Sequence, residues 1–107
     1  MNLDMNEIFQ GMLAAMRVHV TSGAKELEEY ASRYMERRKH RLAEIARLYS
    51  EKIITADQMK EELGDEAQLL EAQLLATEAM GKAIAQKAAN AAISFLTDYF
   101  LRLIKPL

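Results

Sequence analysis

Few side chains in this sequence belong to the types that carry out catalysis. The chain of 107 residues contains two histidines and no cysteine. It carries no Gly-rich phosphate loop, no metalloprotease helix motif and no nucleophile elbow, and no Ser, His and acid set stands at a recognisable spacing. The sequence therefore predicts no catalytic residue and no enzyme activity.

One pair of residues has a spacing that could suit a metal ion. Glu36 and His40 would share a helix face, four residues apart. Cations surround this pair, and neighbouring positive charges disfavour a bound cation; they are Arg37, Arg38, Lys39 and Arg41. His19 stands between Val18 and Val20, which favours an apolar contact. We predict neither a metal site nor a cofactor.

The basic run around this pair could instead contact nucleic acid. In local composition it resembles a basic recognition stripe, and the candidate contacts are Arg33, Arg37, Arg38 and Arg41. Glu36 and Glu44 interrupt the run, and a formal net charge of −2 gives no general attraction to phosphate. A nucleic-acid-associated regulator is therefore kept as the alternative function.

Apolar residues dominate both ends of the chain and predict a contact between copies. Near the C-terminus two apolar stripes run side by side, and one partner helix cannot cover both. An exposed patch of that size would mark an interaction site. The predicted oligomer interface comprises Ile8, Met12, Met16, Ile84, Ala88, Ala92, Phe95, Leu96, Tyr99 and Phe100.

Apolar periodicity predicts an all-α protein in a single domain, 1–107, with helices that position these residues. Apolar residues at three- and four-residue steps predict helices over about 4–20 and 24–51. Thr21, Ser22 and Gly23 between them indicate either a break or a kink.

A third helix is predicted to begin at Ala56 and to run to about Ile104. Thr55 and Gln58 form a capping box, and Ile54 and Met59 stand at the positions of a hydrophobic staple. No convincing stop follows, so this helix would be about 70 Å long.

The two earlier helices would fold back on this long helix as an antiparallel hairpin. On that register the basic run lies beside the acidic residues Glu62, Asp65, Glu66 and Glu71. Oligomerisation, to a homodimer or a higher oligomer, would then complete a helical bundle or coiled coil.

These features favour an interaction protein over the other classes. The absence of cysteine fits a reducing cytoplasm, and the sequence shows neither a signal peptide nor a transmembrane span. We expect a cytoplasmic, homo-oligomeric interaction, adaptor or structural-assembly protein with an unidentified protein partner. A lipid-binding bundle that uses the apolar C-terminal end is the third alternative.

Overall fold

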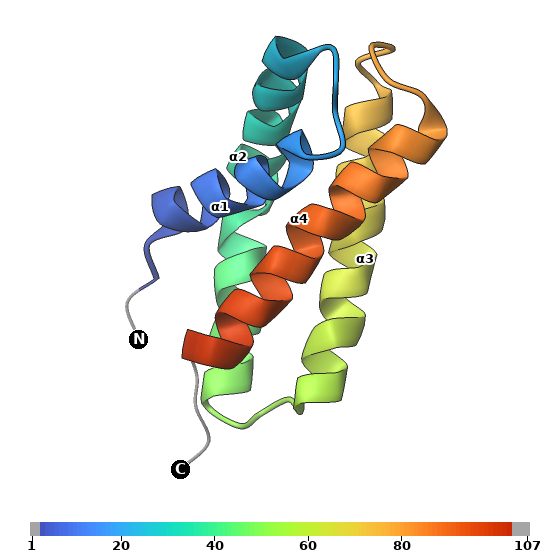
Figure 1. Ribbon diagram of the computed structural model, residues 1–107. Coiled ribbons are helices and arrows are strands. Elements are labelled where there is room, and N and C mark those ends of the chain that lie inside the picture. The colour runs from blue at the N-terminus through green and yellow to red at the C-terminus, as the bar shows by residue number, and fades with distance from the viewer. Residues whose placement is uncertain (1–2, 104–107) are drawn as a thin grey trace.

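The helices of this protein form a bundle-like fold (Figure 1). The computed structural model describes residues 3–103, and no strand occurs within them. The elements are α1 (Met5–Arg17), α2 (Ala24–Ser50), α3 (Ala56–Leu75) and α4 (Lys82–Leu103). Helices α2 and α3 form an antiparallel hairpin, α4 turns back along α3, and α1 lies against α2 and α4. The all-α prediction is confirmed.

The prediction of one helix over about 56–104 is wrong. The chain leaves helical geometry after Leu75 and resumes it at Lys82, so two antiparallel helices replace the long one. Glu78 has a left-handed backbone with φ 58°, and Thr77 Oγ1 accepts a hydrogen bond of 2.9 Å from the Ala79 backbone N–H. Met80 is buried and anchors the turn. The predicted end at Ile104 lies outside the described residues.

The segment 21–23 separates two helices. Helix α1 ends at Arg17, and α2 begins only at Ala24. Gly23 precedes α2 with φ 78°, a left-handed conformation that glycine adopts without a steric penalty. Of the two readings left open by the sequence, the break is the correct one.

The predicted start of the third helix is confirmed. The Thr55 hydroxyl accepts from the Gln58 backbone N–H at 3.1 Å, and the Gln58 amide oxygen accepts from the Thr55 backbone N–H at 2.8 Å. Met59 is buried and Ile54 packs against the core. Two otherwise unpaired backbone donors are thereby satisfied, which fixes the α2–α3 turn.

The core fills the space between the four described helices with mainly aliphatic and methionine side chains, together with Tyr34 and Phe100. Its largest fully buried members come from every helix and include Ile8, Leu27, Leu70 and Phe100. None of the helices in the described range is long and apolar enough to cross a membrane.

Helix α1 meets α4 through an intimate contact between Gly11 and the ring of Phe95. A Cβ added at Gly11 would lie 2.0 Å from Phe95 Cζ, so the ring occupies the space that a side chain would need. Gly64, in the middle of α3, differs, because a Cβ there would meet nothing within 4 Å. Alanine substitutions at Gly11 and Gly64 therefore make the same chemical change in two different surroundings, so that their effects on stability can be compared.

We expect Gly11→Ala to lower the free energy of unfolding by about 1–3 kcal/mol, because the added methyl group displaces the Phe95 ring. Gly64→Ala should raise it by up to about 1 kcal/mol, because alanine favours the helix and meets no obstacle. Urea unfolding followed by circular dichroism measures both. Equal stabilisation by the two substitutions would contradict the Gly11–Phe95 contact.

Candidate functional site

Most of the predicted interface residues are buried inside a single chain. Seven of the ten are at most 1% exposed, and they are Ile8, Met12, Met16, Ala88, Ala92, Leu96 and Phe100. Helix α4 packs against both α1 and α3, so neighbours within the chain cover most of its apolar surface. Their apolar character therefore does not require a second copy.

The other three predicted interface residues keep exposed area on α4. Ile84 is 39% exposed, and Phe95 and Tyr99 are partly buried. The rings of Phe95 and Tyr99 lie 6.0 Å apart between centroids. A surface hollow of about 410 Å³ is lined by this pair together with Glu7 and Arg102. We call these four residues the aromatic surface.

Charges of both signs border the aromatic surface. Glu7 comes from the first turn of α1 and Arg102 from the last turn of α4, and neither makes an ion pair with another described residue. Partial desolvation and the nearby carboxylates of Glu7 and Asp4 raise the pKa of Tyr99. Like any tyrosine, Tyr99 is an uncharged phenol at neutral pH, and the raised pKa extends that state to more alkaline pH.

The basic run on α2 is largely neutralised by carboxylates. Arg33 donates to Glu29 at 2.8 Å and lies 4.5 Å from the centre of the Tyr30 ring. Arg41 pairs with Glu62 of α3 at 2.9 Å and also with Glu44. The predicted alignment of basic α2 residues with acidic α3 residues is confirmed at this pair.

Two further members of the basic run face α3. Arg38 pairs with Glu66, whereas Arg37 only donates to the Gln73 side-chain oxygen at 3.4 Å. Of the four predicted nucleic-acid contacts, Arg37 is thus the one without a carboxylate partner among the described residues. The pairing leaves little free positive charge for phosphate groups.

Glu66 is the one buried charged residue in the described range, and a complete hydrogen-bond network surrounds it. Its side chain is 3% exposed. Arg38 donates from Nε to Oε1 at 3.0 Å and from Nη2 to Oε2 at 2.5 Å, and the Tyr34 hydroxyl donates to Oε1 at 2.9 Å. Burial and the charge of Glu66 raise the pKa of Tyr34, so its hydroxyl keeps its proton.

The sequence indicated only parts of this network. Glu66 was expected beside the basic run, but its contact with Tyr34 was not predicted. With every buried side-chain donor and acceptor in the described residues satisfied, the network holds two helices together. It offers no free group to a substrate.

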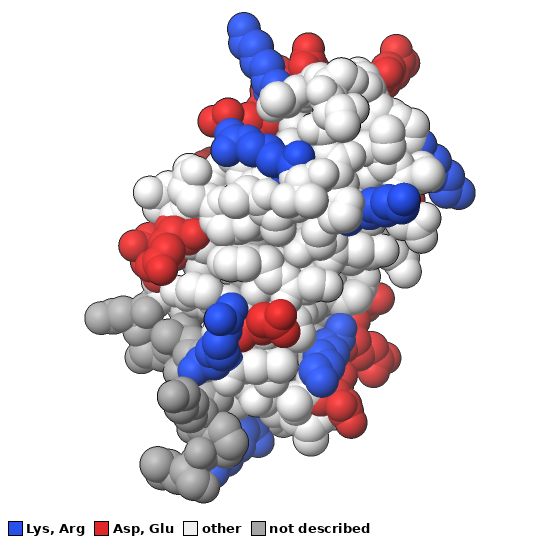
Figure 2. Space-filling view, viewed as in Figure 1, with Lys and Arg blue, Asp and Glu red and all other residues white. Residues whose placement is uncertain are grey.

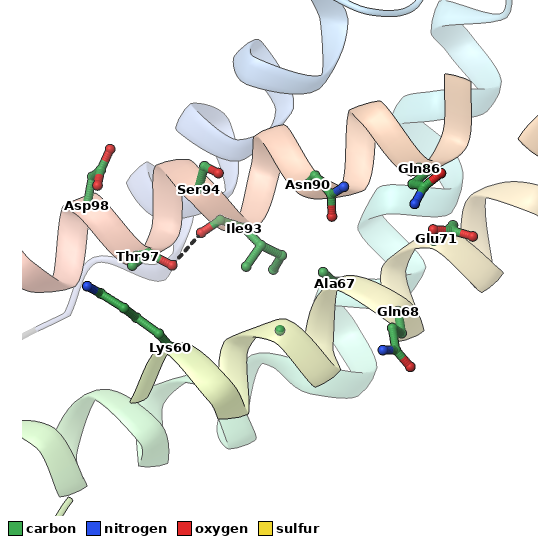
Figure 3. A pocket seen from close by; sticks show the side chains of 11 residues that line it. Lys60, Ala67, Gln68, Glu71, Gln86, Asn90, Ile93, Ser94, Thr97 and Asp98 are labelled. Atoms are coloured by element: carbon green, nitrogen blue, oxygen red, sulfur yellow. Dashed lines mark hydrogen bonds between the residues drawn. The ribbon is translucent and has the colours of Figure 1, made fainter. Parts of the chain in front are cut away.

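A second hollow, of about 510 Å³, lies between α3 and α4 (Figure 3). Polar side chains from both helices line it over a floor that includes Gly64, Ala67 and Ile93. Lys60 reaches from α3 toward Thr97 and Asp98 at one end, and Glu71 lies beside Gln86 at the other. We call it the α3–α4 groove. The sequence did not predict this groove, because it exists only where the chain folds back after Leu75.

Metal-binding geometry is not found in the described part of the chain. No group of three or more His, Asp or Glu side chains there could hold an ion. Glu36, one half of the weighed pair, contacts Lys39 at 3.7 Å.

Comparison with known proteins adds no relative. No protein-family model, no curated protein and no solved structure matches this chain.

The raised pKa of Tyr34 predicts a loss of stability in alkali. A tyrosine with a higher pKa in the folded than in the unfolded protein stabilises the fold fully below its unfolded value, here 10.0. That contribution is lost as the pH rises above this value. We expect the free energy of unfolding to fall between about pH 10 and 11, and Tyr34→Phe to fall less steeply.

At neutral pH the same substitution removes a hydrogen bond to a charged group and should cost about 1–3 kcal/mol. Urea titrations over a pH series measure both effects. Tyr49→Phe serves as the control, because Tyr49 lies outside the Glu66 network. An identical alkaline slope for Tyr34→Phe and the wild type would refute the assignment.

Proposed function

We propose that this protein is a non-catalytic helical interaction protein that self-associates through the aromatic surface on α1 and α4. The observation that carries the proposal is the partly exposed Phe95–Tyr99 pair, bordered by one acidic and one basic side chain. Aromatic residues and arginine are enriched in the centres of protein interfaces, where their large contact areas contribute most of the binding energy.

The charges at the aromatic surface suit a second copy of the same chain. In a two-fold dimer the same patch meets itself, so each charge must find its opposite on the other copy. Glu7 of one copy can meet Arg102 of the other, and the reverse, on either side of the Phe95 and Tyr99 rings. An apolar centre with two such ion pairs is self-complementary.

The distribution of surface charge favours this function over nucleic-acid or lipid binding. Lys, Arg, Asp and Glu stand at scattered places around a broad uncharged area on the face shown in Figure 2. Binding to phosphate groups in nucleic acid or anionic lipid would instead need a continuous basic patch. The carboxylate partners of Arg33, Arg38 and Arg41 count against such a patch on α2.

Tyr99→Glu should weaken self-association by about tenfold or more, because the new carboxylate would lie beside Glu7 in a desolvated contact. Light scattering over a micromolar concentration series measures the mass. Leu69→Glu is the control, since Leu69 is 46% exposed and lines a different surface, between α2 and α3. A wild-type chain that stays monomeric at these concentrations would refute the proposal, as would equal effects of the two substitutions.

A further inference from the structure

The α3–α4 groove contains a pattern on α3 that the aromatic surface does not explain. Lys60, Gly64, Ala67 and Glu71 all line the groove, and their spacing puts them on one face of α3. Lys60 stands four residues before Gly64, and Glu71 stands four residues after Ala67. Two small residues therefore lie at the centre, with a positive and a negative end at equal distances from it.

Gly64 has no role in the packing of the single chain. A glycine inside a helix costs about 1 kcal/mol relative to alanine. An added Cβ at Gly64 would meet nothing within 4 Å, so no neighbour in the chain requires the small residue. What the glycine does provide is exposed backbone that another helix can approach closely.

The charged residues at the two ends of this pattern lack an ion-pair partner among the described residues. Neither Lys60 nor Glu71 makes an ion pair or a side-chain hydrogen bond with another described residue. Most charged residues of the neighbouring helix α2, in contrast, are paired. The side chains of Gln86 and Asn90 on α4 border the same hollow and point into it (Figure 3).

We propose that the α3–α4 groove is a second contact between copies of this chain, in which α3 packs antiparallel on α3 of another copy. A two-fold axis midway between Gly64 and Ala67 places the exposed Gly64 against the partner's Ala67, which is 8% exposed at the floor of the groove. The same axis places Lys60 against the partner's Glu71, and Glu71 against the partner's Lys60. The small central residues let the helix axes approach to the lower end of the usual ~8–10 Å, or closer.

This contact is independent of the proposed function, because the two surfaces face different neighbours of α4. The aromatic surface lies on the side of α4 that meets α1, and the groove lies on the side that meets α3. Both surfaces can be occupied at once. A chain with two separate two-fold contacts forms assemblies larger than a dimer.

The groove contact is tested by exchanging its charges in the full-length chain. Sedimentation velocity measures the dissociation constant in a Tyr99→Glu background, in which the contact through the aromatic surface is weakened. Lys60→Glu and Glu71→Lys should each weaken the remaining self-association about tenfold or more, because each brings like charges together. The double exchange should restore the dissociation constant to within about threefold of the background.

Matched substitutions outside the groove control for net charge. Lys87→Glu and Asp65→Lys make the same changes at exposed positions of α4 and α3 that do not line the groove. These two should leave the dissociation constant unchanged. Circular dichroism checks that every variant keeps its helices.

Gly64→Gln tests the close approach without changing charge. The long side chain should abolish the groove contact, while the open space around Gly64 lets the single chain fold normally. Gly64→Ala is its small counterpart and should keep most of the binding.

Three results would overturn the proposal: no self-association in the Tyr99→Glu background, no restoration by the double exchange, or unchanged binding in Gly64→Gln. Unchanged self-association in Gly64→Gln would also be expected if the groove held a small polar molecule in place of a second copy. If the proposed self-association through the aromatic surface is wrong, the Tyr99→Glu protein will have the same mass as the wild type. The two proposals can therefore fail separately.

Discussion

The carboxylate of Glu66 sets the arrangement of this molecule. A buried charge is tolerated only when paired and hydrogen-bonded, and here Arg38 and Tyr34 of α2 together supply three hydrogen bonds. Sliding α3 along α2 by one helical turn would break all three and leave both charges without partners. Together with the short capped turn between Ser50 and Ala56, the network thus favours one register of the α2–α3 hairpin.

The parts of the fold that could be predicted from sequence are those that depend on neighbouring residues. The capping box of Thr55 and Gln58 needs only four residues to form, and it was placed correctly. The break after Leu75 was missed because buried residues continue at helical spacing on both sides of it, and no proline marks it. Its left-handed residue is Glu78, a conformation that costs about 1–2 kcal/mol and that no local preference favours. The burial of Met80 offsets that cost, and burial depends on the whole fold.

That missed break explains why the site was only half predicted. Phe95 and Tyr99 belong to the apolar end of the sequence, so composition and spacing were enough to select them. The groove required the fold, because in one continuous helix Lys60 and Asp98 would stand about 57 Å apart. The turn brings both residues to the same hollow. Similarly, most of the apolar surface predicted to contact a second copy is covered by α1 and α3. Only a few of the predicted interface residues remain at least partly exposed.

Helix α4 presents different chemistry on its two sides. Toward α1 it contributes aromatic rings whose burial is driven by the hydrophobic effect, which salt does not weaken. Toward α3 it borders a groove whose pairing would depend on exposed charges, which salt screens over a distance of about 8 Å at physiological strength. Since Gly11 holds Phe95 against α1 and Glu66 holds α3 against α2, neither surface has to move for the other to be used. If both proposed contacts form, the groove contact should therefore weaken more with ionic strength than the aromatic contact, whose Glu7–Arg102 pairs flank an apolar centre.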